Sequence, residues 1–96
     1  MRSDLSRGQL AAQLVHAIGE SVSDTVPEGT YAIVLAVPNI KGLLEIRRAL
    51  EDADISHKLI CEPDSPFNGA PTCIGISPTT DRKRIRKVLG RLPLLK

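Results

Sequence analysis

The stretch YAIVLAV at Tyr31–Val37 decides the fold that this sequence predicts. It is almost continuously apolar and rich in strand-forming residues, which is typical of a strand covered by helices on both faces. Pro38 and Asn39 then end the strand and cap a helix over Ile40–Ala53. The short run SHKLIC at Ser56–Cys61 predicts a second strand. This strand–helix–strand order predicts a right-handed parallel crossover.

A further helix is predicted before this unit, from Ser6 to about Val22. Its side that we expect to face the core carries Leu10, Leu14, Ala17, Ile18 and Ser21. On the opposite side, a polar stripe at spacings of four, three and four residues comprises Gln9, Gln13, His16 and Glu20. Such a stripe is either the wet face of an amphipathic helix or the lining of a site.

The segment after the second strand completes the predicted fold. Glu62–Pro71 holds three prolines and one glycine, which predicts a loop at the carboxyl end of a strand, where open α/β sheets place their sites. Thr72–Ile76 predicts a third strand, and Thr79 or Thr80 is expected to cap a last helix that ends at Leu89. The elements together predict an α/β fold, a three-layer α/β/α sandwich with a small mixed sheet.

Length and composition indicate a single domain, residues 1–96. No apolar run approaches the roughly 20 residues that cross a bilayer. The polar start, Met1–Gln9, does not resemble a secretory signal, so we expect a cytoplasmic protein with no membrane partner. Cys61 and Cys73 lack the spacing of a metal motif, so we expect two buried free thiols and no metal site.

Basic charge is concentrated near the carboxyl end. Residues 81–96 carry seven basic side chains and one acidic side chain, a net charge of +6, whereas the first eighty residues carry −4. In the last helix, Lys83, Arg86 and Lys87 share the face opposite the apolar stripe. A charged face of this kind either contacts nucleic-acid phosphates or is simply solvated.

The run GQLAAQLVHA at Gly8–Ala17 resembles the signature of the type-2 peptidyl-tRNA hydrolases, a Gly-Lys pair followed by Ala-Ala-Gln, two residues and His-Ala. Thr72–Pro78 resembles the family's Pro-ended strand, and the intervening elements follow in the family's order. The resemblance covers essentially the whole chain. It implies hydrolysis of the ester between a peptide and the 3′ end of tRNA, with peptidyl-tRNA as substrate and with no metal or cofactor.

Three features depart from the family pattern. Gln9 stands where the family has lysine, so a cation is missing from the expected site. Glu62–Ser65 replaces the family's Asp-Ala-Gly-Arg-Thr segment, which leaves Glu62 or Asp64 as the site carboxylate. The family's apolar first strand has no counterpart before Met1, so this sheet is expected to lack a strand or the start to be truncated or misassigned.

The resemblance implies roles for particular residues. His16 is the expected proton carrier, because imidazole takes either protonation state near neutral pH. Gln13 would hold a substrate carbonyl or the attacking water. Glu62 or Asp64 would orient His16 or that water. Thr72 would offer a hydroxyl at the same edge of the sheet. The expected substrate-binding residues are Gln9, Arg7, Lys83, Arg86 and Lys87, the last three through tRNA phosphates.

Two other functions remain open on the sequence. One is a degenerate relative that binds tRNA or another RNA without cleaving it, which Gln9 favours and His16 disfavours. The other is a small βαβ interaction module, built from the strand–helix–strand unit. A Ser–His–Asp hydrolase is disfavoured because the sequence has no GxSxG elbow. A sheet that lacks a strand leaves an edge or core face to cover, so we also expect a homodimer.

Overall fold

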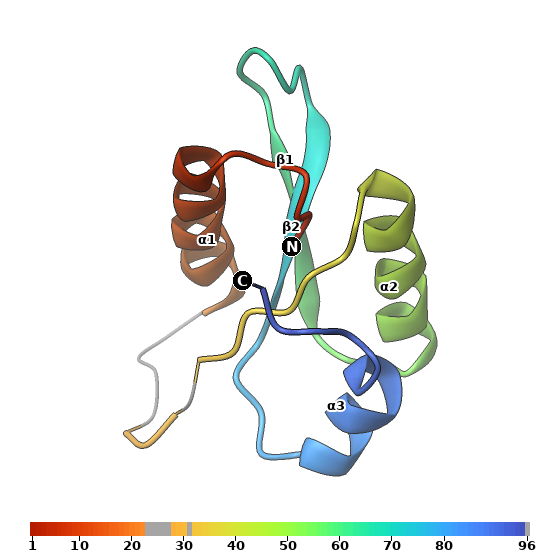
Figure 1. The fold of residues 1–96 in the computed structure, drawn as a ribbon. Coiled ribbons are helices and arrows are strands. Elements are labelled where there is room, and N and C mark those ends of the chain that lie inside the picture. Colours follow the sequence, from red (N-terminus) through yellow and green to blue (C-terminus); the bar gives the residue numbers. More distant parts are fainter. Residues whose placement is uncertain (23–27, 31, 96) are drawn as a thin grey trace.

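A computed structural model describes residues 1–22, 28–30 and 32–95 of the chain (Figure 1). The regular elements within these ranges are α1 (Arg7–Ser21), α2 (Ile40–Asp52), β1 (His57–Glu62), β2 (Ala70–Ile76) and α3 (Arg82–Leu89). These elements confirm the predicted small α/β fold and the three predicted helices. No helix within the described ranges is both long enough and apolar enough to cross a bilayer.

Each helix begins at a polar cap. Ser6 forms a capping box with Gln9: the Ser6 hydroxyl accepts from the Gln9 N–H at 3.3 Å, and the Gln9 amide oxygen accepts from the Ser6 N–H at 2.9 Å. Asn39 caps α2 as predicted. The cap predicted for α3 at Thr79 or Thr80 is wrong. Asp81 is the cap, accepting from the Arg84 N–H at 3.2 Å.

The two regular strands form an antiparallel hairpin, with β1 and β2 joined by the predicted loop. The strand predicted at residues 31–37 is wrong as a regular strand, and residue 31 lies outside the described residues. Within this segment Val37 bridges Arg2 in parallel, and Leu35 bridges Leu94 in antiparallel. Each of these two contacts is an isolated bridge. The predicted parallel crossover onto β1 is therefore wrong, since β1 pairs with β2 instead.

Helices lie on both sides of this hairpin, with α1 on one side and α2 and α3 on the other (Figure 1). The residues of β2 alternate accordingly. Cys73 packs in a cluster with Ala17 of α1, whereas Ile74 and Ile76 pack against the cluster that contains Leu50 of α2. With two regular strands and isolated bridges, the predicted sandwich with its mixed sheet is not confirmed in that detail.

Gly75 allows α1 to lie close to β2. A Cβ at this position would collide with the Ala17 carbonyl oxygen and would come within 2.9 Å of the Ser21 Cβ. Backbone groups of a helix cannot give way as the end of a flexible side chain can. The missing side chain at Gly75 therefore sets the distance between helix and strand, and with it the position of every side chain that α1 directs at the sheet.

The face of α1 that packs on the sheet differs from the predicted one. Gln13 and Ala17 are its buried residues, whereas Ile18 is 51% exposed. Burying an amide costs free energy unless its hydrogen bonds are made, and hydrophobic periodicity contains no information on such partners. The prediction of two buried thiols is half wrong, since Cys73 is buried and Cys61 is exposed.

Candidate functional site

The centre of the candidate site is the buried amide of Gln13, which is 2% exposed. Its oxygen accepts a hydrogen bond of 2.7 Å from the Thr72 hydroxyl. Its nitrogen donates to the Glu62 carboxylate at 3.0 Å. These bonds join α1 to both strands of the hairpin and fix which end of the amide faces which partner, because a hydroxyl donor and an ionised carboxylate acceptor distinguish oxygen from nitrogen.

A β-bulge explains why Thr72 reaches α1. The register pairs Ile60 with Cys73 but Cys61 with Pro71, so Thr72 is the extra residue on β2. A bulge interrupts the alternation of side chains between the two faces and redirects one of them. As a result two consecutive residues meet Gln13: Thr72 bonds its side chain, and the Cys73 thiol donates to its backbone oxygen at 3.4 Å.

Glu62, at the end of β1, is the carboxylate that the fold brings to Gln13. It is buried, and its second oxygen accepts from the Asp64 backbone N–H at 3.3 Å. The pKa of the Glu62 carboxyl lies below its ordinary value, first because the Gln13 amide donates to it and then because the Asp64 N–H does. Asp64 thus contributes its backbone N–H to the site, although Asp64 as a whole is exposed to solvent.

His16 lies one helical turn after Gln13, at the outer end of this hydrogen-bonded chain. Its Nδ1 is 3.5 Å from the Glu62 carboxylate, and its side chain is 52% exposed. The Glu62 carboxylate therefore has a buried donor, Gln13, on one side and a solvent-accessible imidazole on the other. A carboxylate beside one ring nitrogen favours the proton on that nitrogen and leaves the other free to accept one from solvent.

The remaining predicted site residues are distributed over two regions. Gln9 lies one turn before Gln13, and its amide oxygen is used in the cap of α1. Arg7 is exposed at the start of the same helix. Lys83, Arg86 and Lys87 are exposed on α3, on the other side of the hairpin from α1 (Figure 1), so the structure does not bring them to Gln13.

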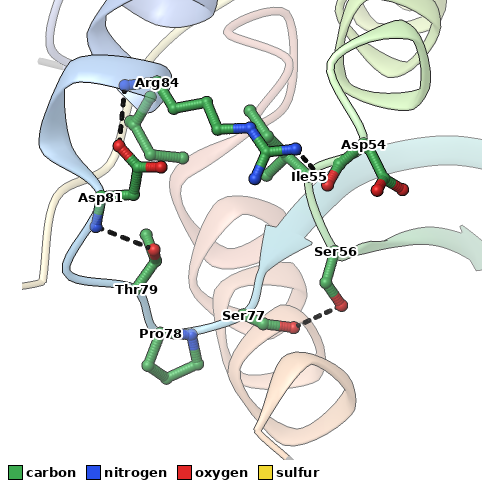
Figure 2. Close-up of a pocket in the computed structure, with 9 residues that line it drawn as sticks. Asp54, Ile55, Ser56, Ser77, Pro78, Thr79, Asp81 and Arg84 are labelled. Atoms are coloured by element: carbon green, nitrogen blue, oxygen red, sulfur yellow. Dashed lines mark hydrogen bonds between the residues drawn. The ribbon is translucent and has the colours of Figure 1, made fainter.

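A concavity with a volume of about 240 Å³ lies beside α3, away from Gln13 (Figure 2). Its wall includes the Ser56 and Ser77 hydroxyls, which are 3.0 Å apart, and Arg84, which donates to the backbone oxygens of Ala53 and Asp54 at the end of α2. Arg84 thereby binds α3 to α2. This concavity contains none of the predicted site residues. Within the described ranges no cluster of three His, Cys, Asp or Glu side chains is arranged to hold a metal ion.

The family model for the Peptidyl-tRNA hydrolase PTH2 family matches residues 1–95 of the chain. The chain belongs to this family. It is 36% identical over 107 residues to the peptidyl-tRNA hydrolase of Methanothermobacter thermautotrophicus, an alignment that covers 99% of this chain and 95% of the relative. It is 34% identical over 107 residues to the peptidyl-tRNA hydrolase of Methanopyrus kandleri, covering 96% of this chain and 89% of the relative.

Two parts of the hydrogen-bonded chain around Gln13 were not predicted from the sequence, the Asp64 backbone N–H and the bulge at Thr72. The spacing of side chains does not predict the Asp64 backbone N–H as a donor, although Pro63 indicates a turn at which a free N–H is expected. The bulge at Thr72 has no recognisable signal in the sequence. The bulge depends on the pairing of β1 with β2, in which β2 has one more residue than β1 between two successive pairs.

Proposed function

We propose that this chain acts as a single-domain peptidyl-tRNA hydrolase. It hydrolyses the ester that joins a peptide, or an N-blocked amino acid, to the 3′-terminal ribose of tRNA. Membership in the PTH2 family supports the reaction class. The observation that carries the assignment of the site is the continuous chain from Thr72 through Gln13 to Glu62, which ends at the solvent-accessible imidazole of His16.

In the proposed reaction His16 is the proton acceptor and Glu62 orients it. With a proton on Nδ1 facing Glu62, the exposed Nε2 removes a proton from a water molecule. The water oxygen bonds to the ester carbonyl carbon, and the tetrahedral intermediate then breaks its bond to the ribose oxygen. That oxygen takes the proton back from His16. The products are a peptide with a free carboxyl group and tRNA with a free ribose hydroxyl.

Glu62 is the orienting group because its lowered pKa makes it a poor proton acceptor. A carboxylate that already accepts from Gln13 and from the Asp64 backbone gains little from a further proton. It does stabilise a positive charge on a neighbouring imidazole, which is what forms when His16 takes the proton of water. Gln13 and the Asp64 N–H therefore act in the proposal by keeping Glu62 ionised and in place.

Gln9 is assigned to substrate binding because of its position on α1. It precedes Gln13 by one turn of α1, and its amide nitrogen has no hydrogen-bond partner among the described residues. That nitrogen is available to donate to the substrate carbonyl, although as a neutral donor it stabilises a developing oxyanion less than a lysine does. The proposed reaction uses no metal or cofactor.

Contact with the tRNA backbone is assigned to the exposed basic side chains of α3, Lys83, Arg86 and Lys87, and to Arg7. Arg84 is excluded from this set because its guanidinium binds the carbonyl oxygens at the end of α2. Contacts of this kind neutralise phosphates and do not distinguish sequences. The substrate is therefore bound with a steep salt dependence and with little preference among tRNAs.

Release of tRNA from an N-acetylated aminoacyl-tRNA tests the proposal. The wild-type protein should release tRNA well above the spontaneous rate, and His16→Ala should lose most of this release. The matched control is His57→Ala, because His57 is the chain's other histidine and contacts the Ile55 backbone at the far end of β1. No release by folded wild-type protein would overturn the hydrolase assignment, and tRNA binding without release would support a binding-only relative.

We also propose a cytoplasmic homodimer. Translation produces the proposed substrate in the cytoplasm. Val15 and Ile18 lie on the outer side of α1 and are 68% and 51% exposed, so a second copy covering this side would remove apolar surface from water. Sedimentation velocity should give a dimer for the wild type and a monomer for Ile18→Glu. A wild-type monomer at all accessible concentrations would refute the dimer.

A further inference from the structure

The hairpin has one edge that is paired with other segments, at β2, and one edge that is open, at β1. Beyond β2, the Arg2 N–H donates to the Thr72 oxygen at 3.3 Å, and the segments around Val37 and Leu94 continue the pairing outward. On the other side of the hairpin, β1 has no neighbouring segment among the described residues. The outer edge of β1 therefore presents unpaired backbone groups, in the arrangement to which another extended chain can add as a strand.

The register identifies the backbone groups on this edge. The Ser77 N–H donates to the Ser56 oxygen at 3.1 Å. In an antiparallel pair the backbone groups of every second residue point at the partner strand, so those of Lys58 and Ile60 also point at β2. The backbone groups of the intervening residues point away from β2. These outward residues are His57, Leu59 and Cys61, and none of their backbone groups bonds another segment of the described chain. The bulge does not disturb this edge, because the extra residue is on β2.

The open edge leads into the candidate site. Glu62 directly follows Cys61, and its carboxylate lies 3.5 Å from the imidazole of His16. The polar flank of α1 that carries His16 therefore faces the end of β1 at which Glu62 lies. An extended chain along the edge of β1 would thus reach the proposed catalytic groups at the end where Glu62 lies.

We infer that the outer edge of β1 binds the peptide moiety of the substrate as an added strand, parallel to β1, with its carboxyl end at Glu62 and His16. The inference rests on the proposed function and names the part of the substrate that the edge recognises. The peptide runs parallel to β1 because its esterified end must lie at Glu62. Backbone pairing accepts any side chain, so an edge of this kind would bind peptides with little regard to their sequence.

The edge sets the length of peptide that gains from this pairing. From His57 to Cys61 the strand covers four intervals of about 3.3 Å, or about 13 Å, which accommodates about four residues of an extended peptide. The ratio kcat/KM should therefore rise from an N-acetylated single residue to a tetrapeptide and then level off. Each backbone hydrogen bond that is gained should contribute a factor of about two to ten.

Peptides with single N-methyl groups give the decisive test. In an added strand only every second N–H faces the edge, so methylation at successive positions of an N-acetyl-tetraalanyl-tRNA should alternate between a loss of about tenfold in kcat/KM and little change. An equal rate for N-acetyl-alanyl-tRNA and the unmethylated tetrapeptide, or methyl effects without alternation, would overturn the inference alone. Absence of release from every substrate would overturn the proposed function, and the inference with it.

A variant of the edge provides a second measurement. Leu59→Pro removes an N–H that points outward, which an edge strand tolerates better than a central strand. In this variant the ratio of kcat/KM for the tetrapeptide to that for the single residue should fall toward one. A retained advantage in the folded variant would contradict the inference. If the variant does not fold, the N-methyl series decides by itself.

Discussion

Replacing Thr72 by valine should separate positioning from contact with substrate. Thr72 is fully buried and therefore cannot touch the substrate, but its hydroxyl donates to the Gln13 amide oxygen at 2.7 Å. Valine has nearly the same shape and no donor. The buried Gln13 oxygen would lose its one side-chain donor among the described residues, and an unsatisfied buried acceptor costs about 1–3 kcal/mol. Thr72→Val should therefore lower the free energy of unfolding by this amount.

The same change should also affect the reaction. Without Thr72 the Gln13 amide is free to turn, and its oxygen would then face the Glu62 carboxylate, which it repels. Glu62 would lose its first donor, so the pKa of its carboxyl should move up toward the ordinary value. A displaced Glu62 would no longer hold His16, and misplacement of such a group lowers kcat by about ten- to a hundredfold.

Urea denaturation and an NMR titration of the Glu62 carboxyl measure the two effects. The urea midpoint of Thr72→Val should fall by about 1 M, and the Glu62 carboxyl should titrate at higher pH than in the wild type. Thr72→Ser keeps the donor and should retain the wild-type titration and kcat. If valine preserves both and serine does not, the methyl group is what matters, and the hydrogen-bonded chain is not the positioning device.

The remaining predictions concern other parts of the structure. The lowered pKa of Glu62 contributes stability above its unfolded value of about 4.5, so the stability difference between wild type and Glu62→Gln should shrink as the pH of a denaturation series falls below 4.5. Gly75→Ala should destabilise the folded protein by about 1–3 kcal/mol and lower tRNA release, because α1 must move away from the added methyl group. Gly8→Ala has open space around the added methyl group and should not destabilise the protein. Equal thermal midpoints for the two variants would contradict this prediction. Charge reversal at Lys83, Arg86 and Lys87 should flatten the salt dependence of tRNA binding by about three counterions, and Arg48→Glu on α2 should not.

Local patterns in the sequence were sufficient for much of the fold. The polar caps and apolar stripe of α2 predicted it to within one residue, because capping and periodicity act within a few positions. The segment at 32–37 was misjudged because an apolar run indicates burial without saying whether neighbouring strands are long enough to pair. Regular strands need continuous partners, and here the partners are segments near residues 2 and 94.

The candidate site shows the same limit. The spacing of Gln13 and His16 placed them one turn apart on α1, but it could not show that Gln13 is buried. That depends on a hydroxyl and a carboxylate 59 and 49 residues away. The choice between Glu62 and Asp64 depended likewise on the hairpin, which directs the Glu62 side chain at α1 and leaves Asp64 exposed. Long-range partners of this kind cannot be read from a single sequence.

Chemical rescue of His16→Ala tests the central claim most directly. The claim is that the imidazole of His16 takes the proton of the attacking water while Glu62 orients it. Release of tRNA from N-acetyl-aminoacyl-tRNA by His16→Ala should be slow and should rise in proportion to added imidazole, which fills the vacated space beside Glu62. Release at the wild-type rate by His16→Ala without imidazole would contradict the account.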